Sequence, residues 1–178
     1  MRLFVGIPMD AAVVAELVAL QQRLRGRDDG LRWTAPETWH VTLQFLGNST
    51  TEQLECLKTR LGAIEARQVS IQLEQPGVFE RVGVFHVGVH PGPGLLQLQQ
   101  AVTAATMQCG FVPEDRTFRP HITLARAKGR SHALTDLRSR MSSARQFHAF
   151  TAKRFLLYES FLGPGGSRYE VRDEFKLS

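Results

Sequence analysis

The sequence predicts an α+β protein of two lobes related by a pseudo-twofold axis, with antiparallel sheets lining a central cleft and helices outside. Three observations support this. Strand-like and helix-like hydrophobic patterns alternate along the 178 residues. The tetrapeptide HVTL at 40–43 returns as HITL at 121–124. The chain is long enough for one compact domain, or two small lobes sharing a core, and too short for two independent domains of ordinary size.

The composition is typical of a soluble globular protein, with 43% hydrophobic and 22% charged residues. No apolar run approaches the roughly 20 residues that span a bilayer, and the first apolar run is too short for a secretory signal. We therefore expect no membrane association, a cytoplasmic location and a monomer. Cys56 and Cys109 fall in separate predicted helices without CxxC spacing, so we expect reduced thiols and neither a disulfide scaffold nor a zinc site.

The first half of the chain begins with a short buried strand and a helix. Apolar residues spaced four, three and four apart mark one face of this helix, and Asp10 caps it. Ser49 and Glu52 predict a capping box for a second helix. The expected elements are a strand at 3–7, a helix at 13–24, an approach loop at 32–38, a strand at 40–47, a helix at 54–64, and strands at 69–73 and 82–89 separated by a break at Pro76 and Gly77.

The second half continues with the same kinds of element. Gly110 closes its first helix, and Pro120 leads directly into the second histidine strand. The sequence GPGG at 163–166 predicts a turn between two strands. The expected elements are a helix at 95–109, a strand from 121, a helix at 134–141, and strands at 147–150, 153–161 and 168–177.

Element order suggests an internal duplication. His40 and His121 are 81 positions apart, and the segments VGI at 5–7 and VGV at 87–89 are 82 apart. A match in element order at one offset is harder to attribute to chance than one short motif. We expect one two-lobed domain over 1–178, with repeats at roughly 1–81 and 82–178.

The repeated motif combines polar and apolar faces. Alternate side chains of a strand point the same way, so His40, Thr42 and Gln44 are expected on one face, with Val41, Leu43 and Phe45 on the other. In the second copy His121 and Thr123 share a face. Lobes packed about a pseudo-twofold axis would bring both polar faces together across the cleft.

Two imidazoles on opposite sides of a phosphate can divide the work of hydrolysis. The unperturbed histidine pKa of about 6.5 allows one ring to be neutral and the other protonated. The neutral ring takes a proton from water and the cationic ring gives one to the departing oxygen, each typically worth ~10²- to 10⁴-fold. Thr42 and Thr123 would donate hydrogen bonds to the non-bridging oxygens. This chemistry requires neither a metal nor a cofactor.

The same residue types have other interpretations. One His-x-Thr in a strand is most often a satisfied, half-buried pair, and the duplication is what favours catalysis. His86 and His90 lack an HExxH pattern or clustered acids, so we interpret them, with His132 and His148, as surface or sheet histidines. The sequence has no GxSxG motif of a serine hydrolase, and its GPGG lacks the ending of a P-loop.

Three further residues are weaker substrate-binding candidates. Arg126 could pair with phosphate, although strict alternation puts it on the face opposite His121. Phe45 could stack a base, but its parity with Val41 favours a core position. Tyr158 could line the cleft, and packing explains it equally well.

The charge distribution favours an anionic polymer as the partner. Residues 1–90 hold nine Lys/Arg and ten Asp/Glu, whereas 91–178 hold thirteen and seven. Between 116 and 145 there are eight Lys/Arg and one acid, Asp136. Such a cluster would attract RNA in a salt-dependent way. An ordinary solvated basic face is the alternative.

The chain resembles the two-histidine phosphoesterases, specifically the bacterial and archaeal RNA 2',3'-cyclic phosphodiesterases, also named 2'-5' RNA ligases. The segments that carry the resemblance are RLFVGI at 2–7, HVTLQFLG at 40–47, FRPHITLAR at 118–126 and LYESFLGPGGSRYE at 157–170. They span nearly the whole chain.

The resemblance implies a bilobal fold and metal-independent opening of a terminal 2',3'-cyclic phosphate of RNA to a 2'-phosphate. It implies that His40 is the general acid, that His121 is the general base, and that Thr42 and Thr123 bind phosphate. RNA with cyclic phosphate or 2'-phosphate ends, such as tRNA fragments, would be the partner. The sequence alone does not assign the acid and base roles.

Two alternatives remain open. The same scaffold could act on a small cyclic nucleotide, a nucleotide-sugar cyclic phosphate or a 2'-5' linkage, or could run the reverse ligation. The protein could also be an RNA-binding module without turnover, for which histidine-to-alanine changes would be silent while charge reversal at Arg119, Arg126 and Arg130 would abolish binding.

Overall fold

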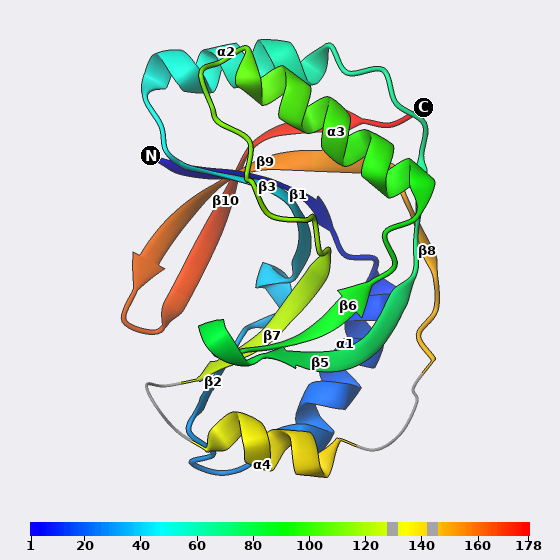
Figure 1. Cartoon of the computed structure of the whole chain (residues 1–178), viewed down its shortest axis with the longest axis vertical. Helices are drawn as coiled ribbons and strands as arrows, with labels where there is room; N and C mark the ends of the chain where they lie inside the picture. The colour runs from blue at the N-terminus through cyan, green and yellow to red at the C-terminus, as the bar shows by residue number, and fades with distance from the viewer. Residues whose placement is uncertain (128–131, 142–145) are drawn as a thin grey trace.

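The computed structural model describes residues 1–127, 132–141 and 146–178. Two four-stranded antiparallel sheets face one another across the middle of the molecule, in the strand orders β10-β9-β1-β3 and β2-β7-β6-β5 (Figure 1). The first sheet consists of β1 (Arg2–Pro8), β3 (His40–Asn48), β9 (Arg154–Gly163) and β10 (Gly166–Lys176). The second consists of β2 (Leu31–Trp33), β5 (Leu73–Phe79), β6 (Val84–Val89) and β7 (His121–Ala127).

The helices lie on the outer faces of the sheets. Figure 1 shows α2 and α3 over the β1–β3 sheet, and α1 and α4 over the β6–β7 sheet. The predicted α+β fold, with antiparallel sheets inside and helices outside, is thus confirmed. The helices are α1 (Ala11–Leu24), α2 (Thr51–Gly62), α3 (Pro93–Met107) and α4 (Ala133–Arg140).

The chain crosses repeatedly between the two layers. Helix α1 follows β1 but covers the other sheet, and α3 follows β6 but covers the sheet that contains β1. Each four-stranded sheet takes two strands from 1–81 and two from 82–178. The two layers are therefore interlocked by the chain, and the division into sequence repeats stays a prediction.

One continuous cluster of buried apolar side chains runs through both layers. The predicted apolar face of α1 is entirely within it, with Val13, Leu17, Leu20 and Leu24 all at most 2% exposed. Full burial of one such side chain contributes about 1.5–3 kcal/mol. Asp10 caps this helix as predicted, since its carboxylate accepts from the Ala12 N–H at 2.9 Å.

Two local predictions were wrong. The capping box of α2 is formed by Thr50 and Gln53, because the Ser49 hydroxyl instead donates to the Gly47 carbonyl at 3.1 Å. Strand β5 continues through Pro76 and Gly77 instead of breaking there. It is one of the two edge strands of its sheet and pairs irregularly between Leu73 and Pro76, so a proline without an N–H is tolerated.

The approach loop and the connection after α2 also contain short strands. Residues 31–33 form β2, which pairs with β7, and the one-turn 3₁₀ helix η1 (Pro36–Thr38) follows. Strand β4 (Val69–Ile71) pairs with β8 (Phe150–Ala152) in a separate two-stranded sheet. A second 3₁₀ turn, η2 (Glu80–Val82), joins β5 to β6.

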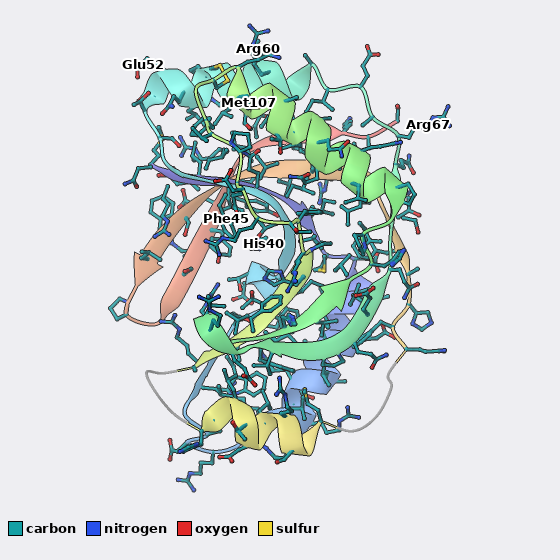
Figure 2. The ribbon with its side chains drawn as sticks, viewed as in Figure 1. His40, Phe45, Glu52, Arg60, Arg67 and Met107 are labelled. Atoms are coloured by element: carbon teal, nitrogen blue, oxygen red, sulfur yellow. A yellow bond between two sulfur atoms is a disulfide. The ribbon has the colours of Figure 1, made fainter. Side chains whose placement is uncertain are left out.

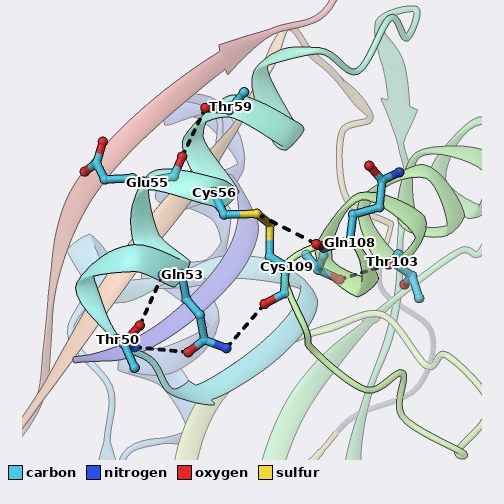
Figure 3. The surroundings of a disulfide bond; sticks show 9 residues. Thr50, Gln53, Glu55, Cys56, Thr59, Thr103, Gln108 and Cys109 are labelled. Carbon is cyan, nitrogen blue, oxygen red and sulfur yellow. Dashed lines mark hydrogen bonds between the residues drawn. A yellow bond between two sulfur atoms is a disulfide. The ribbon is translucent and has the colours of Figure 1, made fainter.

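The expectation of two reduced cysteines is contradicted by a disulfide between Cys56 and Cys109. Figure 3 shows the bond joining α2 to the turn after α3, beside the amide of Gln53, which donates to the Cys109 carbonyl at 3.3 Å. The two Cα atoms are 5.8 Å apart although the residues are 53 positions apart in sequence. Only the packing of α2 against α3 brings them together, so sequence spacing gave no signal.

Candidate active site

A cleft of about 2010 Å³ lies between the lobes and is lined by all four residues of the paired motif, His40, Thr42, His121 and Thr123. Each histidine is the first residue of its strand, β3 or β7, and each is partly exposed. Burial lowers the pKa of His40, and the imidazole of His121, when protonated, lowers it further. Side chains 81 positions apart thus meet in one cleft.

The two imidazoles are held in the same way. The Nδ1 atom of His40 lies 2.8 Å from the Thr38 carbonyl oxygen, and the Nδ1 atom of His121 lies 2.8 Å from the Arg119 carbonyl oxygen. A carbonyl can only accept, so each Nδ1 carries the proton and donates it. In the neutral ring Nε2 is therefore the basic atom. Thr42 Oγ1 lies 3.0 Å from Nε2 of His40.

A bulge interrupts both histidine-bearing strands at the same place. On β3, Thr42 pairs with Gly6 and Gln44 with Val5, so Leu43 is an extra residue. On β7, Thr123 pairs with His86 and Ala125 with Phe85, so Leu124 is extra. Such an insertion reverses which face the following residues occupy. The burial patterns of residues 40–46 and 121–127 are identical as a result.

The bulge on β3 overturns the predicted faces of Gln44 and Phe45. Gln44 borders the cleft but is buried, and its side-chain oxygen accepts a hydrogen bond from the Thr106 hydroxyl of α3 at 2.8 Å. Phe45 is 58% exposed and lines the cleft, so the core position favoured by strict alternation was wrong. Figure 2 shows Phe45 above His40, on the side of Met107, which also lines the cleft.

The bulge on β7 likewise overturns the predicted face of Arg126. This residue occupies the position that corresponds to Phe45, is exposed and lines the cleft, so it does not lie opposite His121 as alternation predicted. Its guanidinium lowers the pKa of both His40 and His121. Arg126 is thus close to both imidazoles. Arg119 also lines the cleft, whereas Arg130 lies outside the described residues.

Aromatic side chains surround His40. The ring of Phe4 lies 4.7 Å from the imidazole, that of Tyr169 5.3 Å and that of Tyr158 5.7 Å. The cleft-lining residues include Tyr169 but not Tyr158, which is buried and stacked on Phe4. Burial raises the pKa of Tyr158 to about 12. Sequence reasoning did not single out Tyr169, whose only signal was its place in the C-terminal segment of the family resemblance.

His121 has a third histidine as its neighbour. His86 is buried in β6 with its ring 5.5 Å from that of His121 and 3.8 Å from that of Phe79. It is a sheet histidine as expected, but its contact with the site was missed. The contact comes from the pairing of β6 with β7, which puts His86 opposite Thr123. The pairing of β1 with β3 puts Gly6 opposite Thr42 in the same way. The corresponding segments are therefore 5–7 and 85–87, and the alignment of 5–7 with 87–89 was off by two.

Two glycines make room for these rings. A Cβ atom on Gly6 would lie 3.2 Å from the His40 ring, and one on Gly77 would lie 2.7 Å from the His86 ring. Real Cβ atoms essentially never approach a neighbour at under 3.0 Å. Because these two glycines have no Cβ atom, the rings of His40 and His86 can pack directly against the backbone of the neighbouring strand.

Burial makes all three imidazoles poor bases in the free protein. Desolvation lowers the pKa of His40 and of His86 to about 4 and also lowers that of His121. The Thr38 and Arg119 carbonyls act in the opposite direction, because each stabilises a protonated ring. At neutral pH both catalytic candidates are therefore uncharged with Nε2 unprotonated, and Nε2 of His40 accepts a hydrogen bond from the Thr42 hydroxyl.

The described residues contain no group of three or more His, Cys, Asp or Glu placed to hold a metal ion. Within the same part of the chain, no helix has the length and apolar character needed to cross a bilayer.

Known proteins with the same organisation were found by sequence and by structure. The chain is 30% identical over 173 residues to the RNA 2',3'-cyclic phosphodiesterase of Archaeoglobus fulgidus, covering 96% of this chain and 97% of that protein. It is 27% identical over 178 residues to the protein of that name from Escherichia coli K12, covering 99% and 97%. The crystal structure of E. coli LigT complexed with 3'-AMP superposes with a TM-score of 0.82 at 25% identity, covering 99% and 98%.

The family model described as the 2'-5' RNA ligase superfamily matches residues 9–160, which include both histidine motifs and both bulges. This chain therefore belongs to the 2'-5' RNA ligase superfamily.

Proposed function

We propose that this protein is an RNA 2',3'-cyclic phosphodiesterase that opens a terminal 2',3'-cyclic phosphate to a 2'-phosphomonoester. Water adds to phosphorus, the bond from phosphorus to the 3' oxygen breaks, and that oxygen takes up a proton. The observation that carries the proposal is the matched pair of imidazoles in one cleft, each with Nδ1–H fixed by the carbonyl two residues upstream.

His121 serves as the general base and His40 as the general acid in this proposal. The lowered pKa of His121 leaves its Nε2 unprotonated at neutral pH and ready to take a proton from water. His40 must first acquire a proton, although burial holds its pKa at about 4 in the free protein. A bound phosphate supplies a negative charge that favours the imidazolium, so substrate binding is expected to raise this pKa.

The remaining cleft residues would bind and orient the substrate. Thr42 and Thr123 donate hydrogen bonds to the non-bridging oxygens, and Arg126 adds charge-assisted hydrogen bonds. Phe45 offers an exposed ring face on which a base can stack. Tyr158 acts indirectly, by packing around the His40 ring.

RNA as the substrate class is supported by the names of the relatives and by the size of the cleft. Pockets for small ligands typically occupy about 300–1,000 Å³, and this cleft is larger. With a 5'-hydroxyl in place of water as the nucleophile, the same groups would expel the 3' oxygen from the cyclic phosphate and give 2'-5' ligation.

The test is to incubate the purified protein with an oligonucleotide that ends in a 2',3'-cyclic phosphate and to identify the monoester by ³¹P NMR. We expect a 2'-phosphate, and activity that survives EDTA. A 3'-phosphate, or turnover that requires added metal, would contradict the proposal. His90→Ala, an exposed histidine outside the cleft lining, is the matched control for the active-site variants and should retain full activity. RNA binding without any product would favour the non-catalytic module.

A further inference from the structure

Arg32 lies directly opposite Arg126 in the antiparallel pairing of β2 with β7. Directly opposed residues share one face of a sheet, with Cβ atoms about 4.5–5.5 Å apart. Both side chains are exposed and both line the cleft. Because β2 is the edge strand of its sheet, Arg32 lies one strand further out than the β7 residues that surround the reacting phosphate.

This arrangement leaves two positive charges without a protein counter-ion. Like charges directly opposite one another destabilise a sheet. Among the described residues neither guanidinium forms an ion pair with a carboxylate, and Glu80, an acid of the same cleft lining, is paired with Arg138 at 2.7 Å. Residues 128–131 and 142–145 contain no Asp or Glu. The other acids of the cleft lining, Glu114 and Asp115, form no ion pair with either arginine among the described residues, so both guanidiniums are available to the anionic groups of a ligand.

The two arginines also differ in their relation to the imidazoles. Arg126 lies on β7 with His121, lines the same cleft and acts electrostatically on both His40 and His121, so it is the arginine nearer the proposed position of the reacting phosphate. Arg32 extends the same positive face towards the open edge of the sheet. Neighbouring phosphates follow one another along a nucleic acid strand, and a guanidinium matches each of them with two parallel hydrogen bonds.

We propose that Arg32 binds the phosphodiester immediately upstream of the terminal nucleotide, so that the cleft selects an oligonucleotide over a mononucleoside cyclic phosphate. This inference rests on the proposed function, because it takes the reacting cyclic phosphate to lie between His40 and His121. It adds a second anion subsite and a direction, with the RNA strand leaving the catalytic centre over β2.

The test compares kcat/KM for three substrates: a nucleoside 2',3'-cyclic monophosphate, a dinucleotide ending in a 2',3'-cyclic phosphate, and the same dinucleotide with an uncharged methylphosphonate at its internal linkage. Hydrogen bonds to charged groups contribute about 1.5–3 kcal/mol, so the unmodified dinucleotide should be preferred over the mononucleotide by roughly 10- to 100-fold. Arg32→Gln should remove most of that preference, and Arg32→Lys should restore part of it. For the wild type, the methylphosphonate should lower kcat/KM by the same factor by which Arg32→Gln lowers it on the natural dinucleotide. Combining the variant with the modified substrate should lower kcat/KM no further than either change alone.

Arg60→Gln is the matched control, because Arg60 is exposed on α2 and lies outside the cleft lining (Figure 2). It removes one positive charge and should leave the preference intact. Thermal unfolding of each variant checks that it is folded. An equal loss on all three substrates with Arg32→Gln would overturn the inference, as would a wild type that does not discriminate between mononucleotide and dinucleotide. If the wild type hydrolyses none of the substrates, the proposed function itself fails.

Discussion

The chemistry of the site depends on how one atom of each imidazole is prepared. A backbone carbonyl fixes Nδ1–H in both His40 and His121, which leaves Nε2 as the reactive atom. Burial among Phe4, Tyr158 and Tyr169 then keeps His40 uncharged until an anion arrives. In the proposed mechanism, protonation of His40 would be coupled to phosphate binding, and acid catalysis would be restricted to the substrate complex.

The acid role of His40 can be tested by changing the leaving group. A sugar oxygen requires protonation as it departs, whereas a nitrophenolate does not. His40→Ala should therefore lose ~10²- to 10⁴-fold on a cyclic phosphate and much less on a nitrophenyl phosphodiester. His121→Ala should lose similar factors on both substrates. If His121→Ala is the variant that the better leaving group restores, the two roles are exchanged. Initial rates of the two variants on the two substrates give the answer.

At the scale of the element, the duplicated bulge determines which side chains reach the cleft. The positions of the two histidines and two threonines followed from strand periodicity and a shared offset. Phe45, Gln44 and Arg126 did not, because strict alternation holds only up to the extra residues Leu43 and Leu124. A bulge is set by pairing with β1 or β6, and the local sequence does not reveal that pairing. Arg32 was placed in a loop for the same reason, since its strand exists only through contact with β7.

The disulfide between α2 and the end of α3 is expected to stabilise the fold. A native disulfide typically contributes about 2–4 kcal/mol, mostly by restricting the unfolded chain. For a chain of this size 1 kcal/mol shifts the Tm by about 2–4 °C, so the Cys56→Ser/Cys109→Ser double variant should melt roughly 4–16 °C lower.

Calorimetry with and without dithiothreitol provides the control for this prediction. The reductant should lower the Tm of the wild type to that of the double variant and leave the variant itself unchanged. Equal melting temperatures for reduced and oxidised wild type would show that the bond contributes nothing to stability.

At the scale of the whole molecule, two interlocked layers leave a cleft that is lined by His40 and His121, with the buried His86 next to His121, and all three histidines have a lowered pKa. The unfolded chain binds protons at these histidines near pH 6.5, whereas folded His40 and His86 do so only near pH 4. The unfolded state therefore holds more protons between these two values. The stability contributed by the neutral rings is fully present above about pH 6.5 and is lost as the pH falls towards 4.

The free energy of unfolding should accordingly decrease between pH 7.5 and pH 5. One pKa unit corresponds to about 1.4 kcal/mol, so His86 alone accounts for about 2 kcal/mol at most at pH 5. His86→Gln should flatten this pH dependence, because glutamine does not titrate. Urea titrations at the two pH values measure it. A wild type that is equally stable at both, or a variant with an unchanged pH dependence, would contradict this electrostatic description.

The central claim is that both imidazoles act on one phosphorus atom. Single-turnover rates on an oligonucleotide ending in a 2',3'-cyclic phosphate test this most directly, for the wild type, His40→Ala, His121→Ala and the double variant. Groups that act as a unit are strongly non-additive, so each single variant should lose ~10²- to 10⁴-fold and the double variant little more. Full activity in either single variant, or losses that simply multiply in the double variant, would contradict the claim.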